Sequence, residues 1–493
     1  MLKIAFIHPD LGIGGAERLV VDAALGLQNL GHQVDIYTSH HDPNHCFEET
    51  KDGRLKVHNI VPPFPRAING KFHILFAHLR QLHLTASLLS PGAPKYDVFF
   101  VDQLSTCIPL LRAIGRTRVV FYCHFPDKLL ANGEFIEDPI SRAQRNMLKG
   151  GLLKRIYRYP MDWLEEITTR QADVILANSN FTGRVFKDNF PSIRRTPEVV
   201  YPGINIVAYE ATQDSSNDPD VAAILSDRPT LISLNRFEKK KNVALAVEAF
   251  ARIRAQEPNS ANLRLVLGGT FIVIRQISRF QYICAGGYDP RLEDNMLTLY
   301  SLIDLVSKKH SLSYNVITPS SPKAVKIPPL NTTLENPAVL FVLNFTTAQR
   351  TALLMSPSTI GLLYTPANEH FGIVPVEGMI CGVPVLACDS GGPVESIVDE
   401  PAEERTGWLR APNPEIWTEA LRQIVDLGEE ERSKMRERAK KRARKMFGME
   451  AMASGIENAL KEAVDMGKVQ SRVTLWLVVL VAIMCLLFAL RWA

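Results

Sequence analysis

Two pairs of charged residues each follow an apolar run of the chain. Arg236 and Lys241 come after one run, and Glu369 and Glu377 come after another. Cations just beyond a strand can hold a diphosphate, Arg through its planar fork and Lys as a point charge. A carboxylate inside the following helix can accept hydrogen bonds from the vicinal hydroxyls of a sugar. The alternative for both pairs is a solvated charge run or a surface helix, although the apolar residues between Glu369 and Glu377 argue against an exposed face.

The elements around the two glutamates are typical of a parallel α/β unit. Residues 360–364 and 383–387 are predicted as buried strands, with a short helical segment between them. In such units ligands lie beyond the carboxyl ends of the strands, where helix N-termini present free backbone N–H groups. The loop that contains Glu369 and Gly372 therefore predicts a close approach of backbone to a phosphate.

A glycine-rich turn near the start of the chain predicts a second place where backbone can approach a phosphate. Residues 1–8 are predicted as a first strand, Gly14 and Gly15 as the turn, and residues 16–30 as an amphipathic helix. Small residues expose backbone N–H groups to an anion. The turn does not match G-x-G-x-x-G, and an ordinary tight turn is the alternative.

His124 follows a predicted strand at residues 119–122. A histidine there lies toward the ligand-binding edge of a sheet, although a lone histidine is more often structural. Residues 128–160 are predicted as a lid-like loop with helical pieces, and residues 207–220 as a linker. Residues 71–90 mix large apolar side chains with histidines, which fits either an amphipathic helix at a membrane interface or a core-facing helix.

Composition limits the class of protein. A length of 493 residues predicts two domains of ordinary size, and 46% apolar with 22% charged residues is typical of a globular chain. A net charge of +4 gives no case for nucleic-acid binding. Seven scattered cysteines without a C-x-x-C pair indicate reduced thiols in a cytosolic setting and no zinc site. The first residues carry too short an apolar run for a signal peptide.

Five motifs occur in the order expected for one family, at a spacing that fits two domains. On these motifs the chain resembles the retaining family 4 glycosyltransferases. Within them it is most similar to the dolichol-pathway α-1,3/α-1,6-mannosyltransferases. The motifs are His8–Arg18, Cys123–Asp127, Asn235–Glu238 with Lys241 and Asn242, Gly286–Asp289, and Glu369–Glu377. The resemblance covers roughly residues 1–450. It implies an α/β fold of two facing Rossmann-like domains (GT-B): an acceptor-side domain at 1–203, a donor-nucleotide domain at 221–428 and a basic crossover helix at 429–447.

The resemblance also implies a reaction. The donor would be GDP-mannose, and the acceptor a dolichyl-diphosphate-linked chitobiose–mannose in lipid-linked oligosaccharide assembly for N-glycosylation. The protein would lie on the endoplasmic reticulum membrane with its catalytic domains in the cytosol, alongside other glycosyltransferases of the pathway. No cofactor or metal would be required, because cationic side chains and helix N-termini stabilise the leaving diphosphate.

The residue roles implied by the resemblance follow the motifs. Arg236 and Lys241 would neutralise the donor diphosphate, Glu377 would bind the ribose, and Glu369 would hold the transferred sugar. His124 would contact that sugar as the fourth catalytic residue. The remaining donor-binding residues would be Gly14, Gly15, Phe371, Gly372, Ile373 and Val374. Retention would proceed by front-face departure, with the leaving phosphate oxygen taking the acceptor proton.

One stretch departs from the family pattern. The strand at residues 263–267 should continue almost directly into Gly286, but Gly268–Cys284, seventeen residues, intervene. The segment is either a genuine loop or a retained intron, and we favour the intron because it is in frame and its ends can be encoded by splice-site triplets. This interpretation predicts that messenger RNA from the source lacks these codons and that the shortened protein is the more soluble and more active form.

Residues 473–490 form an uncharged apolar run, which predicts a transmembrane helix. Lys461, Lys468 and Arg472 precede it and Arg491 alone follows, a bias that places the main body in the cytosol. Three other functions compete with a membrane-anchored mannosyltransferase. One is another membrane-associated retaining sugar-nucleotide glycosyltransferase. A sugar-nucleotide epimerase shares the fold pair but has no need of an anchor. A membrane scaffold without chemistry has no need of Arg236, Lys241, Glu369 and Glu377 together.

Overall fold

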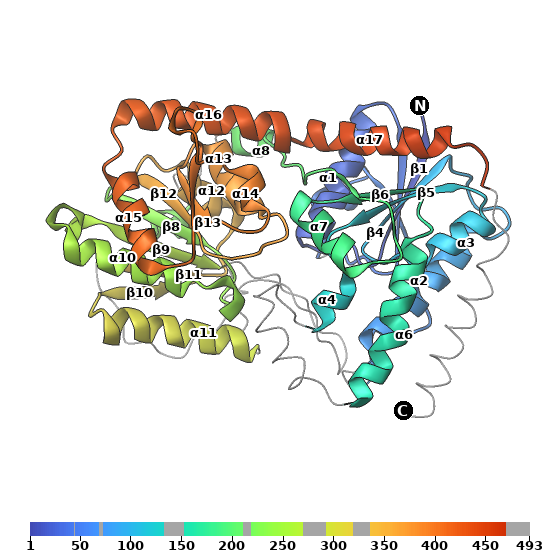
Figure 1. The fold of residues 1–493 in the computed structure, drawn as a ribbon, viewed down its shortest axis with the longest axis horizontal. Coiled ribbons are helices and arrows are strands. Elements are labelled where there is room, and N and C mark those ends of the chain that lie inside the picture. Colours follow the sequence, from blue (N-terminus) through green and yellow to red (C-terminus); the bar gives the residue numbers. More distant parts are fainter. Residues whose placement is uncertain are drawn as a thin grey trace. The chain divides into compact units, whose positions relative to one another are not determined.

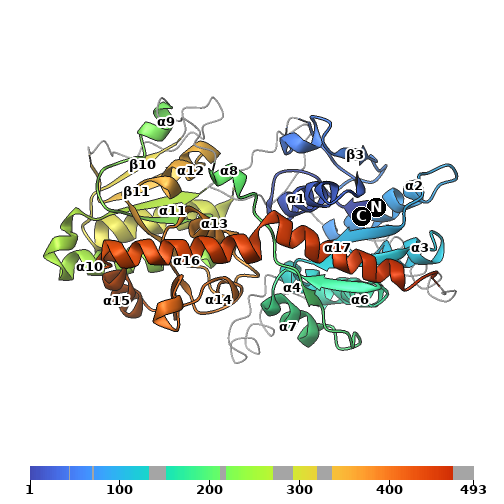
Figure 2. The same ribbon diagram turned by 90° about the horizontal axis from the view of Figure 1, so that it is seen from above.

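The structure is a computed structural model of the 493-residue chain, and it describes residues 1–43, 45–68, 72–132, 152–210, 218–269, 292–318 and 336–469. The chain divides into two compact units. Unit 1 contains the described residues of Met1–Gly203 and those from Met449 onward, and unit 2 contains the described residues of Ile204–Gly448. Within each unit, helices cover both faces of a parallel sheet (Figures 1 and 2).

Unit 1 is built on a parallel sheet with the strand order β3-β2-β1-β4-β5-β6-β7 over the described residues. Its strands are β1 (Lys3–His8), β2 (Gln33–Thr38), β3 (Lys56–Asn59), β4 (Val98–Asp102), β5 (Arg118–Cys123), β6 (Val174–Ala177) and β7 (Glu198–Val199). Its helices are α1 (Gly15–Asn29), α2 (His73–Leu88), α3 (Ile108–Ala113), α4 (Asp127–Asn132), α6 (Leu152–Thr169), α7 (Asn180–Asn189) and α17 (Met449–Asp465).

The two faces of this sheet carry separate cores, because successive side chains of a strand alternate between its faces. Ile4 and Phe6 pack with apolar residues of α1 and α17. Ala5 and Ile7 pack on the other side with residues of α2, α3 and α7. Helix α17 lies so close to α1 that a Cβ on Gly26 would meet the Ala453 Cβ at 2.6 Å. The C-terminal part of the chain is therefore an integral layer of unit 1.

Unit 2 repeats this plan with the strand order β10-β11-β9-β8-β12-β13-β14, all parallel, over its described residues. Its strands are β8 (Thr230–Leu234), β9 (Arg264–Gly269), β10 (Tyr314–Ile317), β11 (Val339–Leu343), β12 (Thr359–Tyr364), β13 (Val385–Cys388) and β14 (Gly407–Arg410). Its helices are α8 (Val207–Glu210), α9 (Pro219–Ala222), α10 (Ala244–Gln256), α11 (Glu293–Asp304), α12 (Thr347–Met355), α13 (Ile373–Cys381), α14 (Pro393–Ser396), α15 (Pro414–Val425) and α16 (Glu429–Phe447).

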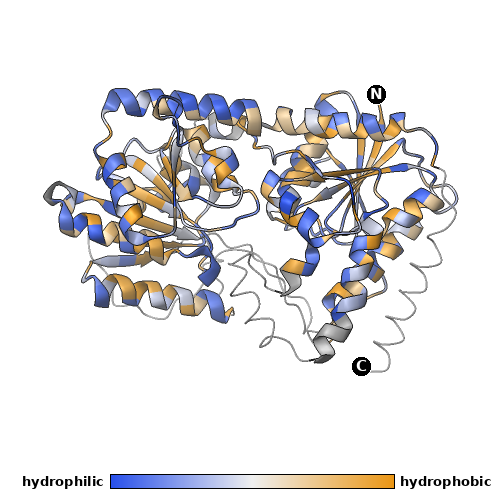
Figure 3. Cartoon of the chain, viewed as in Figure 1, coloured by the Kyte–Doolittle hydropathy of each residue, from blue (hydrophilic) through white to orange (hydrophobic). Residues whose placement is uncertain are grey.

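The central strands of both sheets are buried on both faces, as parallel sheets require. Colouring by hydropathy shows the apolar strands inside each unit and the polar outer surface of α16 (Figure 3). In α16 only Met435, Ala439, Ala443 and Phe447 are buried, a single stripe at a spacing of four residues. Four of its arginines donate to backbone carbonyls elsewhere in unit 2 instead of facing solvent alone. Their acceptors are the carbonyls of Ile360 for Arg432, Gly382 for Arg436, Arg405 for Arg438 and Ser396 for Arg442.

Several sequence predictions need correction. Unit 2 begins at Ile204, upstream of residue 221, and the segment predicted as a linker contains α8 and α9. Helix α2 faces the core, since its apolar residues Leu75, Leu84 and Leu88 are buried, so the interfacial alternative for residues 71–90 is not supported. Unit 1 contains α17 in addition to residues 1–203.

The two unusual apolar segments are described only in part. Gly268 and Gly269, the first residues of the predicted insertion, are the last residues of β9 and pair with Val342 and Leu343. The rest of that segment and the Gly286–Asp289 motif lie outside the described residues, as does the run at 473–490. Among the helices that the structure describes, none combines the length and apolar character needed to cross a bilayer.

Candidate active site

The charged residues of unit 2 lie at the carboxyl ends of two neighbouring strands. Strand β8 ends at Leu234 and leads into Arg236 and Lys241, while β12 ends at Tyr364 and leads through Glu369 into α13. The two strands pair side by side in the sheet, so their following loops share one edge. The Thr365 hydroxyl donates to the Lys241 carbonyl at 2.6 Å and ties these loops together.

Lys241 and Glu369 form a charged pair at this edge. Lys241 Nζ donates to Glu369 Oε2 at 2.5 Å, and the Tyr364 hydroxyl also bonds to the Glu369 carboxylate. Burial would raise the pKa of Glu369, but Lys241, His370 and Arg236 outweigh it and lower the pKa to about 2. Glu369 is therefore ionised throughout the physiological range. The sequence placed these two residues 128 positions apart, and the fold brings them into contact.

Arg236 is the more accessible cation. Its Nη1 contacts Glu238 Oε1 at 2.9 Å, and its side chain is 34% exposed, against 12% for Lys241. Glu238 is shared with Lys240, whose Nζ lies 3.1 Å from Oε2. Arg236 thus keeps part of its planar fork toward solvent, where a diphosphate could take two parallel hydrogen bonds.

The N-terminus of α13 is shaped by glycines. Gly372 has φ of 84° and precedes the helix without a side-chain cap, so the first N–H groups of α13 have no capping side chain. Gly392 packs against the same loop: its N–H donates to the Glu369 carbonyl at 2.8 Å, and a Cβ there would lie 2.2 Å from the Phe371 carbonyl oxygen. Any side chain at Gly392 would displace the segment that carries Glu369.

The predicted sugar-contacting segment divides into buried and open parts. The Phe371 side chain is only 4% exposed and packs against Phe447, with ring centroids 5.6 Å apart and ring planes tilted by 58°, so its role is packing. Ile373 is 37% exposed. The segment can therefore offer backbone groups to a ligand, as predicted for residues 371–374, but not the Phe371 ring.

Glu377 is buried, at 5% exposure, and belongs to a separate network in unit 2. Its Oε1 accepts hydrogen bonds from the Tyr209 hydroxyl at 2.5 Å and from Arg350 Nη1 at 2.8 Å. Burial and the neighbouring carboxylate raise the pKa of Tyr209 far above its ordinary value, so the hydroxyl stays protonated. The sequence analysis did not identify Tyr209 or Arg350 as partners of Glu377. Arg350 lies on α12 and Tyr209 lies on the segment predicted as a linker, so neither belongs to a motif that contains Glu377.

The predicted residues of unit 1 gather at the corresponding edge of its own sheet. Asp102, at the end of β4, accepts hydrogen bonds from His8 Nδ1 at 2.8 Å and from His124 Nε2 at 3.0 Å. His8 and Asp102 end the adjacent strands β1 and β4, and His124 directly follows the next strand, β5, which explains why the three residues meet. His8 and Asp102 were not predicted as site residues, although each ends an apolar run and could have been found by that signal.

Charge is retained in this network despite burial. His8 and Asp102 are each 1% exposed. Burial would lower the pKa of His8, but the Asp102 carboxylate raises it to about 9. Conversely, burial would raise the pKa of Asp102, yet His8 and His124 hold it below its ordinary value. Because Asp102 binds Nε2 of His124, the imidazole is oriented with Nδ1 directed away from that bond.

Gly14 and Gly15 mark the start of α1, which has no side-chain cap. Gly14 is extended, and a Cβ on Gly15 would meet nothing within 4 Å. Neither backbone conformation nor crowding inside unit 1 requires a glycine at 15. The open space is therefore available to a ligand that approaches the helix N-terminus.

Comparison with known proteins agrees with this arrangement. Residues 13–207 match Glycosyltransferase Family 4, and residues 330–446 match Glycosyl transferases group 1. The solved structures of sucrose-phosphate synthase from Thermosynechococcus elongatus and of the catalytic domain of starch synthase IV from Arabidopsis thaliana share the fold. The first has a TM-score of 0.63 at 17% identity, over 95% of this chain and 100% of its own. The second has a TM-score of 0.62 at 14% identity, over 94% of this chain and 99% of its own. The predicted GT-B class, two Rossmann-like domains with parallel sheets, is confirmed; its C-terminal transmembrane helix stays a prediction.

Curated relatives show the family. The chain is 45% identical over 465 residues to alpha-1,3/1,6-mannosyltransferase ALG2 of Rhizomucor pusillus, covering 94% of this chain and 92% of that protein. It is 39% identical to the protein of the same name from Saccharomyces cerevisiae, over 94% and 85% of the two chains. The chain therefore belongs to the ALG2 family of alpha-1,3/1,6-mannosyltransferases.

Proposed function

We propose that this enzyme transfers mannose from GDP-mannose, with retention, to a dolichyl-diphosphate-linked chitobiose–mannose acceptor, forming α-1,3 and α-1,6 linkages. The Lys241–Glu369 pair beside the uncapped N-terminus of α13 carries the proposal. It joins a cation, a fixed carboxylate and free N–H groups at the carboxyl edge of a parallel sheet, which suits a sugar linked to a diphosphate.

Arg236 and Lys241 stabilise the negative charge that develops on the leaving diphosphate, together with the α13 N-terminus. Glu369 holds hydroxyls of the transferred mannose and is kept ionised and oriented by Lys241 and Tyr364. Ribose hydroxyls compete with Tyr209 for the Glu377 carboxylate. On this account the leaving phosphate oxygen takes the acceptor proton, and no metal or other cofactor is needed.

In unit 1, Asp102 fixes the His124 ring so that Nδ1 can accept a hydrogen bond from a sugar hydroxyl. Gly15 leaves space at the start of α1 for the donor phosphates, whereas the Glu17 carboxylate lies against Gly14 and must move for a phosphate to approach there. We place the enzyme on the endoplasmic reticulum membrane through residues 473–490, with its catalytic units in the cytosol and other glycosyltransferases of the pathway as neighbours.

An assay of the full-length protein in detergent tests the proposal. A defined lipid-diphosphate chitobiose–mannose acceptor is offered with labelled GDP-mannose, GDP-fucose, UDP-glucose or UDP-N-acetylglucosamine. We expect transfer from GDP-mannose alone, without added divalent cation and in the presence of EDTA, with an α linkage by NMR. Transfer from a uridine nucleotide, a β linkage or loss of activity in EDTA would contradict the corresponding part of the proposal. Epimerisation of the donor without any acceptor would favour the epimerase instead.

A further inference from the structure

A second polar cluster lies at the carboxyl edge of the sheet in unit 1, and none of the roles above uses it. It consists of Asp10 in the loop after β1, Arg66 in the segment after β3, and Arg80 on α2. Asp10 comes two positions after His8, and its carboxylate contributes to the raised pKa of that histidine. The Asp10 cluster is therefore close to the network that holds His124.

The backbone on both sides of Asp10 is fixed to the loop after β2. The Ser39 N–H donates to the Pro9 carbonyl at 3.1 Å. The Leu11 N–H donates to the His40 carbonyl at 2.8 Å. Because both neighbours of Asp10 are held in this way, its side chain projects from a fixed position. A carboxylate that is fixed in advance loses little conformational freedom when a ligand binds to it.

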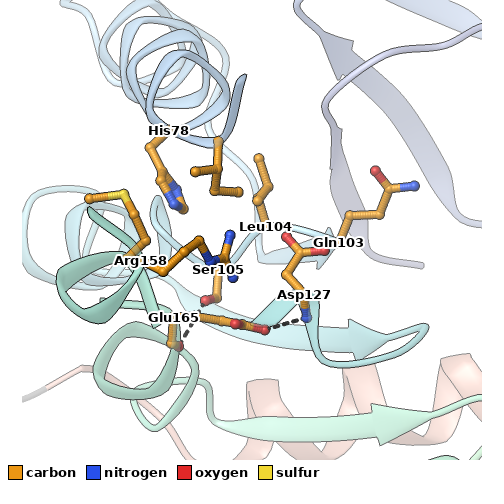
Figure 4. Close-up of a pocket in the computed structure, with 9 residues that line it drawn as sticks. His78, Gln103, Leu104, Ser105, Asp127, Arg158 and Glu165 are labelled. Carbon is orange, nitrogen blue, oxygen red and sulfur yellow. Dashed lines mark hydrogen bonds between the residues drawn. The ribbon is translucent and has the colours of Figure 1, made fainter. Parts of the chain in front are cut away.

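Arg80 is held in place from two directions. Its Nη2 donates to the Ser39 carbonyl at 3.1 Å, and its Nη1 donates to the Phe64 carbonyl at 3.4 Å. Helix α2, which carries Arg80, is itself closely packed in unit 1. The space between α2, α4 and α6, lined in part by His78 and Asp127, has room for only about one water molecule (Figure 4). The guanidinium of Arg80 is therefore a structural support of the cluster.

Both arginines approach the same oxygen of Asp10. Arg66 Nη2 donates to Oδ1 at 3.0 Å, and Arg80 Nη2 lies 3.7 Å from that oxygen. Over the described residues the second oxygen, Oδ2, accepts no hydrogen bond, and the Asp10 side chain is 45% exposed. Arg66 likewise makes no other hydrogen bond with a residue that the structure describes. The cluster thus presents an available carboxylate oxygen beside available guanidinium N–H groups.

This combination suits neighbouring hydroxyls of a sugar. A hydroxyl group both donates and accepts, so one hydroxyl can donate to Asp10 Oδ2 while its neighbour accepts from Arg66. A phosphate would have to lie against the exposed Asp10 carboxylate, and a cation would have to lie against two arginines, so neither is favoured. The chemistry of the cluster therefore indicates a neutral saccharide.

We propose that Asp10 and Arg66 bind neighbouring hydroxyls of the acceptor mannose, the sugar that receives the transferred residue. Asp10 Oδ2 accepts from one hydroxyl, Arg66 donates to the next, and Arg80 keeps the carboxylate in position. The proposed function places the transferred sugar at His124, and the Asp10 cluster lies close to the network of that residue, which assigns it to the accepting sugar. The inference rests on the proposed function, and it names the residues of unit 1 that recognise the acceptor.

Steady-state kinetics of the full-length enzyme separate acceptor binding from donor binding. Asp10→Asn should raise the KM for the lipid-linked acceptor about tenfold or more, because it removes a hydrogen bond to a charged group. Arg66→Ala should raise the same KM about fivefold or more for the same reason. The KM for GDP-mannose should change less than about twofold in both variants, since only uniform binding of the acceptor is lost.

Glu48→Gln is the matched control, because it also removes a carboxylate of unit 1 that is paired with a cation, Lys51. It should leave both KM values unchanged. Melting curves establish that each variant folds, and either variant of the cluster gives the readout if the other does not fold. A purely structural role would lower the melting temperature and leave the acceptor KM as in the wild type, which would overturn the inference.

Titration of two matched saccharides by calorimetry tests the same contacts without turnover. Mannosyl-chitobiose carries the accepting mannose and chitobiose does not, so the wild-type protein should prefer the first about tenfold or more. Asp10→Asn should reduce this preference to about twofold or less. Equal affinity for the two saccharides in the wild type would overturn the inference.

The two kinds of measurement distinguish failure of the site from failure of the proposed function. A protein that shows a preference for mannosyl-chitobiose dependent on Asp10, but transfers no mannose, would contradict the proposed function and support this site. Mannose transfer with an unchanged acceptor KM in both Asp10→Asn and Arg66→Ala would contradict the site alone.

Discussion

The carboxyl edges of the two sheets are built on the same plan and hold different chemistry. In unit 1, Asp102 and its two histidines form a hydrogen-bonded network in which His8 and Asp102 are almost fully buried. In unit 2, the Lys241–Glu369 pair is partly exposed and lies beside Arg236 and an uncapped helix start. The same parallel α/β frame thus produces a buried orienting network in one case and an accessible cationic site in the other, which shows why function must be argued from the site.

Removing Asp102 should have the largest effect on stability. Asp102→Ala leaves two histidines without the carboxylate between them, and breaking a buried pair of this kind costs about 3–5 kcal/mol. Denaturant unfolding followed by circular dichroism measures the loss, with Asp52→Ala on the exposed surface of unit 1 as the control. A stability of Asp102→Ala equal to that of the control would mean that the network contributes nothing to the fold.

The two edges should respond to pH in opposite directions. His8 has a pKa raised from 6.5 to about 9, so its contribution is complete below pH 6.5 and is lost as pH rises through 9. Glu369 has a pKa lowered from 4.5 to about 2, so its contribution is present above pH 4.5 and is lost as pH falls through 2. The difference in melting temperature between wild type and His8→Gln should therefore shrink above pH 9, and that for Glu369→Gln should shrink below pH 4.5. If the two differences in melting temperature changed with pH in the same direction, the proposed contrast between the two edges would be wrong.

Alanine substitution of one glycine at each edge should change stability less than Asp102→Ala does, and by different amounts in the two units. Gly392→Ala in unit 2 forces a Cβ against the Phe371 backbone, and overpacking of this kind costs about 1–3 kcal/mol. Gly15→Ala in unit 1 meets nothing within 4 Å, so stability should be unchanged. A raised KM for GDP-mannose in Gly15→Ala, at unchanged melting temperature, would show that the open space is used by the donor. Equal destabilisation of both variants would contradict the described packing.

Deleting residues 473–493 should change the stability of the two units least among these variants. No residue of either site lies there, so the released protein should keep both units folded and should leave the membrane fraction in part or completely. Sedimentation of membranes and a melting curve measure the two properties. Sequons at Asn180, Asn331 and Asn344 should remain unglycosylated in the full chain if its units face the cytosol. Glycosylation at any of them would place that unit on the other side of the membrane.

Much of the fold could be predicted from sequence because its signals are local. The strands around residues 4–7, 119–122 and 230–234 are short apolar runs between turn residues, and the structure confirms them. The helix predicted at residues 16–30 is α1, confirmed to within a residue at each end. Signals that depend on distant parts of the chain were missed. Packing of α17 against α1 depends on residues more than four hundred positions apart, which no local pattern contains.

The site divides in the same way. Arg236, Lys241 and Glu369 were singled out because they follow strands within recognisable motifs, and Glu377 because it lies in the helix that comes next. Their partners Tyr364, Tyr209 and Arg350 were not found, since each acts through a contact that the folded chain creates. The sugar-binding role predicted for the backbone of residues 371–374 stays a prediction, and the structure adds that the Phe371 ring is buried.

The affinity of unit 2 for the donor diphosphate tests the central claim most directly. GDP-mannose is titrated into full-length wild type, Arg236→Ala, Lys241→Ala and the control Lys240→Ala, whose ammonium contacts Glu238 in the same loop. Each charged contact to a desolvated diphosphate contributes about 1.5–3 kcal/mol, so the first two variants should bind roughly ten- to a hundredfold more weakly. Lys240→Ala should bind as wild type does. Equal affinity in all four proteins would contradict the assignment of this edge as the donor site.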